Sequence, residues 1–437
     1  MTRYWNPEIE CMPVEKLHAL QGERLVAAVE RVYANVPFYA ARMKAAGLLP
    51  GDIRGIDDLP KLPFTLKSDL RDHYPFGTFA VPMSQVVRLH ASSGTTGKST
   101  VVGYTANDIA MWSECIARSL TNVGVTKDDV IHVAYGYGLF TGGLGLHYGA
   151  ERLGAAVVPI SGGNTARQIQ LLVDFAPTVL ACTPSYALHL AGELEAYGVT
   201  KKDLKLRIGI FGAEPWSEGM REQIEEKLGL SAYDIYGLSE IVGPGVSMDC
   251  ERKHGMHVMA DHFVPEIVDP HTGAPLPSGR KGEIVFSCVT KEALPLLRYR
   301  TGDLTVLHTA PCACGRTSPR MEKVTGRSDD MLIIRGVNVF PSQIESVLLT
   351  FGEVEPHYLI HVDRVDNLDQ MEVHVEMTPA FFADRLEHLE ETERRLAAGL
   401  HSTLGIWARV RLVEPRTLPR SEGKAKRVVD NRKIFAK

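Results

Sequence analysis

The chain has 437 residues, of which 44% are hydrophobic and 23% charged, and its formal net charge is −5. This composition is ordinary for a soluble globular protein of two or three domains, and the slightly acidic charge argues against nucleic acid or an anionic membrane as a partner. No apolar run is long enough to span a bilayer, and Met1–Pro13 lacks the apolar core of a secretory signal. Seven cysteines, an odd and modest number, indicate a reducing cytoplasm.

The first segment, up to about residue 85, predicts polar helices that are interrupted by Pro37, Pro50, Pro60 and Pro63. From about residue 86, apolar runs of strand length alternate with amphipathic segments, which is typical of a mainly parallel sheet covered by helices. The predicted strands are Val86–Leu89, Val130–Ala134, Ala156–Ile160, Thr178–Cys182, Arg207–Phe211 and Ala232–Tyr236.

Polar and glycine-rich segments follow three of these strands. In open α/β sheets, ligands bind outside the carboxyl ends of the strands, so we expect these segments to line a site. They read Thr183-Pro184-Ser185, Gly212-Ala213-Glu214-Pro215 and Tyr236-Gly237-Leu238-Ser239-Glu240.

The last third of the chain predicts a separate, smaller unit. From Glu283 onward the pattern is rich in strands, and a break follows at Gly326–Asp330. Beyond the break, strand and helix patterns mix in a way that indicates an α+β domain of about 105 residues. They predict a strand at Met331–Ile334, a helix at Ser342–Leu349, strands at His357–Val362 and Glu372–Glu376, a charged helix at Arg385–Leu400 and a strand at Arg409–Val413.

The segment Ser92–Ser99 is dense in glycine and hydroxyl residues. Backbone N–H groups, hydroxyls and the charge of Lys98 suit phosphate oxygens. A Walker A loop needs four residues between its first glycine and the Gly-Lys pair, and only Thr95 and Thr96 stand there. The β-forming residues Thr100–Tyr104 follow, so the segment predicts a phosphate-holding loop between two strands. A flexible surface turn is the alternative at this point.

Five motifs together resemble the adenylate-forming superfamily, and they occur in that family's order. They are Ser92–Lys98, Tyr236–Glu240, Tyr299-Arg300-Thr301-Gly302-Asp303, Gly326-Arg327-Ser328-Asp329-Asp330 and Gly423-Lys424. Further stretches are similar to the phenylacetate–CoA ligase branch, namely Trp5–Leu17, Tyr135–Ala150, Phe211–Trp216 and Pro419–Val429. The resemblance covers nearly the whole chain. It implies a large α/β N-terminal adenylation domain of several subdomains (1–328), which binds ATP and the acid, and a small mobile α+β C-terminal domain (329–437).

By this resemblance the protein joins a carboxylic acid to ATP, with Mg²⁺, and passes the acyl group to coenzyme A. Such chemistry requires the charge between two anions to be screened. Glu240 would hold Mg²⁺, Arg327 the ribose or α-phosphate, and Lys424 the carboxylate and α-phosphate. Asp303 would bind the ribose hydroxyls, a task for a two-oxygen acceptor. Without the family, Asp303 reads as a turn cap and Lys424 as part of a solvated basic tail.

The resemblance also implies the residues that surround the nucleotide and the acid. The outgoing phosphates would lie on Ser92, Ser93, Gly94, Thr95, Thr96, Gly97 and Lys98. The adenosine would lie against Ala213, Glu214, Pro215, Asp234, Ile235, Tyr236 and Gly237. The aryl acid would lie among Tyr135, Phe140, Gly212, Ala213, Ile235, Pro244 and Gly245, where small residues leave room for a flat ring and Phe140 could stack on it. Each of the acid-pocket residues could equally belong to the core.

A cluster of cysteine and histidine residues predicts a zinc site. Cys312 and Cys314 lie one residue apart in a turn, and zinc favours four nitrogen or sulfur ligands in a tetrahedron. With Cys250 and His257 they make a Cys₃His set of the kind that some members of this branch carry, while His254 or His262 could serve in place of His257. We expect such a site to be structural, because four protein ligands leave no position for water. Two free thiols and unrelated histidines are the alternative.

The resemblance thus implies an aryl-acid–CoA ligase, with phenylacetate as the leading substrate and a homodimer as the common assembly of the branch. Two alternatives remain from sequence: an AMP-transferring relative of the coenzyme F390 synthetase type, and a non-catalytic nucleotide-binding protein of the same fold. In the family the small domain rotates between the two half-reactions. The pivot falls two residues after the motif arginine, here Asp329, and Gly336 would line the tunnel for the CoA thiol.

Overall fold

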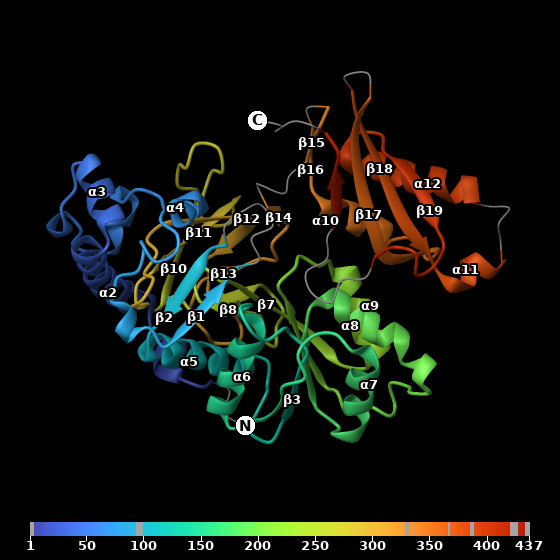
Figure 1. Ribbon diagram of the computed structural model, residues 1–437, viewed down its shortest axis with the longest axis horizontal. Helices are drawn as coiled ribbons and strands as arrows, with labels where there is room; N and C mark the ends of the chain where they lie inside the picture. The colour runs from blue at the N-terminus through green and yellow to red at the C-terminus, as the bar shows by residue number, and fades with distance from the viewer. Residues whose placement is uncertain are drawn as a thin grey trace.

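The computed structural model describes residues 4–92, 99–327, 332–335, 337–365, 368–384, 389–419 and 427–432. Within these residues a large α/β body is followed by a smaller α+β domain, which lies at the upper right of Figure 1. The predicted fold class is therefore confirmed. In the described part of the chain, no helix combines the length and the apolar character that crossing a membrane requires.

The first 85 residues form helices, as predicted, and these cover one end of the large sheet. Leu25, Val29 and Tyr39 pack against Val264 in a core of their own. Proline begins both α3 and η1, because its missing N–H costs nothing in a first helical turn. The elements are α1 (Pro7–Glu10), α2 (Val14–Asn35), α3 (Pro37–Ala45), η1 (Pro50–Asp52), η2 (Ile56–Lys61), α4 (Lys67–Asp72) and η3 (Met83–Gln85).

One half of the large sheet is parallel and is covered on both faces. Its strands lie in the order β7-β6-β5-β3-β4. Helices α5 and α6 pack on one face in one apolar core, and α7, α8 and α9 pack on the other face in a second core. The strands are β3 (Val130–Val133), β4 (Ala156–Val158), β5 (Val179–Cys182), β6 (Ile208–Gly212) and β7 (Ser231–Leu238). The helices are α5 (Ala106–Asn122), α6 (Gly142–Leu153), α7 (Thr165–Asp174), α8 (Pro184–Glu193), η4 (Glu195–Tyr197) and α9 (Glu218–Leu228).

The prediction for Val86–Leu89 needs a correction. The strand there is β1 (Arg88–Ala91), and it pairs antiparallel with β2 (Val101–Tyr104) in a separate two-stranded sheet. The apolar run looked like the first strand of the parallel sheet because sequence does not show a strand's partner. A strand lies on each side of Ser92–Ser99, as predicted, and residues 93–98 between them lie outside the described part of the chain.

The other half of the large sheet is antiparallel, in the order β10-β11-β12-β13-β9-β8, with β14 paired to β12. Strands β8 to β10 were not predicted, because glycine and proline, as in the β8 sequence Gly243-Pro244-Gly245, are unusual in strands. The strands are β8 (Gly243–Met248), β9 (Met256–Val258), β10 (Phe263–Val268), β11 (Lys281–Cys288), β12 (Tyr299–His308), β13 (Arg320–Met321) and β14 (Gly326–Arg327).

The C-terminal domain has its own core, in which α10 and α12 pack on a four-stranded sheet of order β19-β18-β17-β20. The hairpin β15–β16 precedes this sheet. The strands are β15 (Leu332–Ile334), β16 (Val337–Val339), β17 (Val354–Val365), β18 (Leu368–Met377), β19 (Arg409–Val413) and β20 (Val428–Asp430). The helices are α10 (Pro341–Leu348), α11 (Pro379–Asp384) and α12 (Leu389–Leu404). The single helix predicted at Arg385–Leu400 corresponds to α12, and its first four residues lie outside the described part of the chain.

Candidate active site and metal centre

Three of the predicted nucleotide residues meet where β7, β12 and β14 lie together. Asp303 and Arg327 are directly opposite each other across the β12–β14 pair. The Asp303 carboxylate accepts hydrogen bonds from Tyr236 Oη at 2.6 Å and from Arg327 Nη1 at 2.8 Å. A carboxylate has two acceptor oxygens, which is the kind of group that suits a pair of hydroxyls. Burial, followed by the Asp303 charge, raises the pKa of Tyr236 well above its ordinary value, so the phenol stays a donor.

The segment Gly212–Pro215 begins at the last residue of β6 and lies beside the middle of β7. In the parallel pairing, Gly212 is opposite Ile235. A Cβ on Gly212 would stand 2.1 Å from the Ile235 carbonyl oxygen, so only glycine allows this approach. The next residue, Ala213, has a φ of +71°, a strained conformation for a residue with a side chain. Glu214 accepts the backbone N–H of Ser185 at 2.8 Å, which ties the turn to the start of α8.

Asp234 lies on β7 beside this turn and is almost fully buried. Burial and the neighbouring Asp249 carboxylate together raise the pKa of Asp234 to about 7. A protonated carboxyl can donate as well as accept a hydrogen bond, which an adenine edge with both kinds of group could use. The predicted adenine residues Ala213, Glu214, Pro215, Asp234, Ile235 and Tyr236 thus belong to adjacent β-strands or to the turn that follows one of them.

Glu240 lies in the turn between β7 and β8 and is only 5% exposed. Its Oε1 atom is 3.2 Å from Nζ of Lys67 on α4. The Lys67 ammonium group therefore already lies beside the carboxylate that the family resemblance assigns to Mg²⁺. Sequence reasoning missed Lys67, because no motif surrounds it and the contact joins segments far apart in the chain. The only available signal was its place at the start of a short helix after a proline-rich stretch.

The predicted acid-pocket residues fall into two neighbouring groups. Tyr135 follows β3 and lies near Gly212, and its pKa is raised well above the ordinary value, chiefly by burial. Phe140 is 43% exposed, and its ring covers the first turn of α6, where a Cβ on Gly142 would meet it at 2.4 Å. Pro244 packs on the same helix, and its neighbour Gly245 packs on α5. Phe140 is thus no ordinary core residue, while Tyr135 and Gly245 are deeply packed.

The predicted zinc ligands converge. The donor atoms of Cys250, His257, Cys312 and Cys314 all lie within 4.8 Å of one another, and all four residues are buried. Cys250 Sγ is 4.0 Å from Cys312 Sγ, and Cys314 Sγ is 3.3 Å from His257 Nε2. The other ring nitrogen of His257 is 3.2 Å from Ser318 Oγ. An outer hydrogen bond of this kind commonly orients a metal-binding imidazole.

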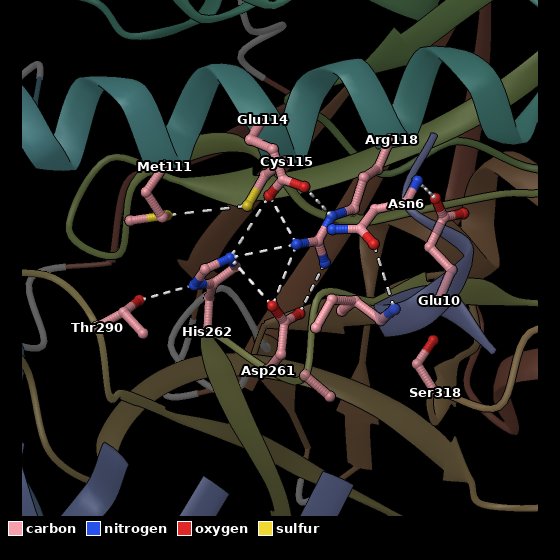
Figure 2. A network of polar contacts seen from close by, with 12 residues as sticks. Asn6, Glu10, Met111, Glu114, Cys115, Arg118, Asp261, His262, Thr290 and Ser318 are labelled. Atoms are coloured by element: carbon pink, nitrogen blue, oxygen red, sulfur yellow. Dashed lines mark hydrogen bonds and ion pairs between the residues drawn. The ribbon is translucent and has the colours of Figure 1, made fainter. Parts of the chain in front are cut away.

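The two alternative histidines lie elsewhere. His262 Nε2 is 3.1 Å from Asp261 Oδ2, in a buried network with Glu114 and Arg118 that Figure 2 shows. Its Nδ1 atom faces Thr290 Oγ1 at 2.9 Å. Within the described residues, His254 and His262 are outside the set that converges with the cysteines. Geometry therefore selects His257.

The N-terminal segment closes over the cysteine turn. Tyr4 Oη donates to the Cys314 carbonyl at 2.9 Å, and Arg316 donates to Glu10 at 2.8 Å. Both members of the second pair are almost fully buried. Thr317 Oγ1 donates to the Met12 carbonyl at 2.6 Å. Residues near the N-terminus thus fix the turn that holds Cys312 and Cys314.

Several predicted residues fall outside the described part of the chain. These are Ser93, Gly94, Thr95, Thr96, Gly97 and Lys98 of the phosphate loop, and Asp329, Gly336 and Lys424 of the C-terminal region. The residues on either side of the phosphate loop are described. Ser92 and Thr100 exchange two hydrogen bonds, which bring the two ends of this segment together. The roles assigned to the nine residues stay predictions.

The C-terminal domain contacts the large body mainly through α10. The ring of Phe340, just before α10, lies where a Cβ on Gly326 would stand, and Ser342 Oγ donates to the Thr325 carbonyl. Leu349, just after α10, packs against the core around α8 and α9. Beyond this helix, Arg416 pairs with Glu193 at 2.9 Å. The interface described is thus one short helix with a few polar contacts at its margin.

Comparison with known proteins gives matches along nearly the whole chain. The "AMP-binding enzyme" family model matches residues 31–289, and the "AMP-binding enzyme C-terminal domain" model matches residues 336–432. The phenylacetate-coenzyme A ligase of Thermus thermophilus is 53% identical, over 98% of this chain and 100% of its own.

Among solved structures, 2-hydroxyisobutyryl-CoA ligase is similar in two states. Its postadenylation state, in complex with 2-HIB-AMP, has a TM-score of 0.93 at 30% identity and covers 99% of this chain and 94% of its own. Its thioesterification state, with 2-HIB-AMP and CoA, has a TM-score of 0.74 at 31% identity and the same coverage.

Proposed function

Because the chain belongs to the AMP-binding enzyme family, in the branch of the phenylacetate-coenzyme A ligases, we propose that it joins an aryl acid, with phenylacetate the leading substrate, to coenzyme A through an acyl-adenylate. The observation that carries the proposal is the 53% identity to a phenylacetate-coenzyme A ligase over essentially both whole chains. The meeting of Tyr236, Asp303 and Arg327 supports it, since these motif residues lie far apart in sequence.

We propose the following division of labour in the first half-reaction. Asp303 accepts the ribose hydroxyls, held in place by Tyr236 and Arg327. The turn after β6 and the middle of β7 frame the adenine. Lys424 approaches the acid carboxylate and the α-phosphate, so that the developing charge meets a fixed cation. Pyrophosphate leaves toward the phosphate loop, where Lys98 supplies charge.

Mg²⁺ belongs to this proposal as a partner of the nucleotide. The residues present fit it, because the Glu240 carboxylate is buried and already faces a cation, Lys67. When bound, Mg²⁺ would neutralise phosphate charge and draw electron density from the α-phosphate. Glu240 would hold it, in place of its present contact with Lys67.

For the second half-reaction we propose that the C-terminal domain, residues 329–437, moves relative to residues 1–328 about Asp329. The large body and the small domain have separate cores and share a small interface. The domain arrangement here resembles that of 2-hydroxyisobutyryl-CoA ligase in its postadenylation state more than that in its thioesterification state, by TM-scores of 0.93 and 0.74. We propose that this arrangement serves the first half-reaction, and that rotation of the C-terminal domain would bring Gly336 toward the path of the CoA thiol.

We also propose that Cys250, His257, Cys312 and Cys314 bind one structural zinc ion. The donor set suits zinc, and four protein ligands would fill a tetrahedral site and leave no position for water. Contacts of Tyr4 and Arg316 fix the turn that carries two of the cysteines. In sequence, this turn is far from the one that carries Glu240. The ion would contribute to folding rather than to the reaction.

The test is pyrophosphate release with a panel of carboxylic acids, with and without coenzyme A. The proposal expects acid-dependent release that is highest with phenylacetate, and thioester only when coenzyme A is present. Release that does not depend on an aryl acid, or thioester formation on aliphatic acids alone, would contradict it. A cytoplasmic location and a homodimer belong to the same proposal; fractionation and the molar mass in solution test them.

A further inference from the structure

Three buried side chains hold the turn between β7 and β8, which carries Glu240, together with the start of β8. Lys291 Nζ donates to the Ile241 carbonyl at 2.8 Å, and Tyr104 Oη donates to the Val242 carbonyl at 2.9 Å. Trp112 Nε1 donates to the Pro244 carbonyl at 2.8 Å. Three carbonyl groups within four residues are thus each fixed by a different side chain. None of these donors belongs to the motifs of the family resemblance.

The three donors form one packed unit. The rings of Tyr104 and Trp112 stack with their centroids 5.2 Å apart, and Lys291 Nζ stands 4.4 Å from the centroid of Tyr104. All three residues are 2% exposed or less. A buried ammonium group is costly unless it is compensated, and here a carbonyl oxygen and the face of a ring provide the compensation. Burial lowers the pKa of Lys291 to about 8.

Two residues of helix α5 support this unit. It carries Trp112 directly, and the Asp108 carboxylate in its first turn accepts the backbone N–H groups of Glu292 at 2.6 Å and Ala293 at 3.0 Å. Asp108 therefore fixes the segment that presents Lys291. The same carboxylate caps the helix through Thr105. Helix α5 therefore fixes the turn in two ways: directly through Trp112, and indirectly through Asp108, which holds the segment that presents Lys291.

We propose that Lys291, with Tyr104 and Trp112, positions the β7–β8 turn so that Glu240 meets the metal–nucleotide. The proposal rests on the function proposed above. Lys291 is a positioning residue and touches no substrate, because it is enclosed. Without its ammonium group, the Ile241 carbonyl would be left without this donor, and the turn next to Glu240 could shift. A small shift of a metal ligand lowers affinity for the bound ion and the phosphates it bridges.

The experiment compares Lys291→Met and Tyr104→Phe with a matched control. Each variant keeps the shape of a buried side chain and removes one donor to a carbonyl. The control is Gln21→Met, because Gln21 Nε2 also donates to a buried carbonyl, that of Ala260, at 2.8 Å, but in another part of the body. Binding of Mn²⁺ with ATP is measured by electron paramagnetic resonance. Acid-dependent ATP–pyrophosphate exchange is measured on the same samples, at a temperature where all are folded.

We expect Lys291→Met to weaken Mn²⁺–ATP binding by about tenfold or more, the scale of one charged hydrogen bond. Tyr104→Phe should weaken it less, and Gln21→Met should not weaken it. Wild-type affinity in both Lys291→Met and Tyr104→Phe overturns the inference, as does an equal loss in Gln21→Met. If Lys291→Met does not fold, Tyr104→Phe against Gln21→Met decides. If no aryl acid supports exchange in the wild type, the proposed function fails, while the binding comparison still decides this inference.

Discussion

The two regions that share the proposed active site are held in very different ways. In the large body, Asp303, Tyr236 and Glu240 lie on or between strands of one twelve-stranded sheet; Asp303 and Glu240 are buried and Tyr236 is partly buried. The C-terminal domain has a separate core, and α10 with a few polar groups makes its described contacts with the body. The former set is built to keep its geometry. The latter contacts are few and partly polar, which fits our proposal that the small domain moves.

This difference matches a reaction of two steps on one nucleotide. The parts that hold ATP and the acid have no reason to move between steps, and they belong to the rigid region. The residues that differ between the steps, Lys424 and Gly336 in our proposal, belong to the detachable region. Changes in the small domain should therefore separate the two half-reactions, while changes in the large body should affect stability or both steps together.

The largest effect is expected at Lys424. We predict that Lys424→Ala lowers acyl-adenylate formation by about 10²–10³-fold, the usual loss for one group that stabilises transition-state charge. Reaction of supplied acyl-adenylate with coenzyme A should stay nearly unchanged, because by then the lysine has left the site. Measuring the two half-reactions separately checks this. An equal loss in both would place Lys424 outside the role proposed.

A change at Asp329 should also separate the two half-reactions, but here the second one should be lost. Proline fixes φ, so Asp329→Pro should hold the domain in one arrangement. We predict that ATP–pyrophosphate exchange persists, while thioester formation falls by about 10²-fold, as misplacement of reacting groups commonly causes. Thioester synthesis at the wild-type rate would show that the domains do not alternate about this residue.

Gly336→Leu is the companion to the Asp329 variant. It should give the same pattern through obstruction of the thiol path, with exchange intact, and it leaves the pivot unchanged. If Gly336→Leu also lost exchange, the glycine would serve the fold rather than the tunnel. Comparison of the two variants therefore distinguishes a blocked movement from a blocked channel.

Sequence predicted the parallel strands and the C-terminal domain because their apolar runs have clear lengths and boundaries. It missed β8 to β10, where glycine, proline and polar residues take strand conformation only because neighbouring strands pair with them. It also assigned β1 to the wrong sheet. Pairing is a property of distant segments, and no local pattern records it.

The candidate site shows the same limit. The motif residues Asp303 and Arg327 were found because the resemblance names them, and their pairing confirms that they lie together. Lys67 and Lys291 were not found, because their contacts are with residues far away in the sequence and each looks locally like any lysine. The choice of His257 over His254 and His262 needed coordinates as well, since all three stand at plausible spacings from the cysteines.

The next largest effect is expected at the proposed zinc site of the large body. We predict that the purified protein carries about one zinc per chain, and that Cys314→Ser loses the metal and about 3 kcal/mol or more of stability, because structural zinc contributes directly to folding. Metal analysis and denaturant unfolding check both points. Cys11→Ser is the control, since Cys11 is a cysteine outside the converging set. Carefully purified wild type without zinc would remove the site, and a zinc-free variant of unchanged stability would remove its structural role.

The smallest effect is expected at the margin of the domain interface. Arg416 and Glu193 form an ion pair at 2.9 Å between the two regions, and Arg416 is largely exposed. Such pairs contribute at most about 1 kcal/mol, so Arg416→Ala should lower adenylation by no more than about fivefold. Thioester formation from supplied acyl-adenylate should not fall, because the pair belongs to the arrangement that this step leaves. Added salt should produce the same trend in the wild type by screening the pair.

The matched control for this pair is Arg395→Ala. Arg395 pairs with Glu353 at 2.8 Å and is similarly exposed, but both residues belong to the C-terminal domain. We expect it to leave the ratio of the two half-reactions unchanged. The exchanged pair Arg416→Glu with Glu193→Arg should restore the wild-type ratio if attraction across the interface is the cause. If Arg395→Ala changed the ratio as much as Arg416→Ala, or if the exchanged pair failed to restore it, the ion pair would not bias the position of the domain. The contacts of α10 would then remain as the main described link between the small domain and the body.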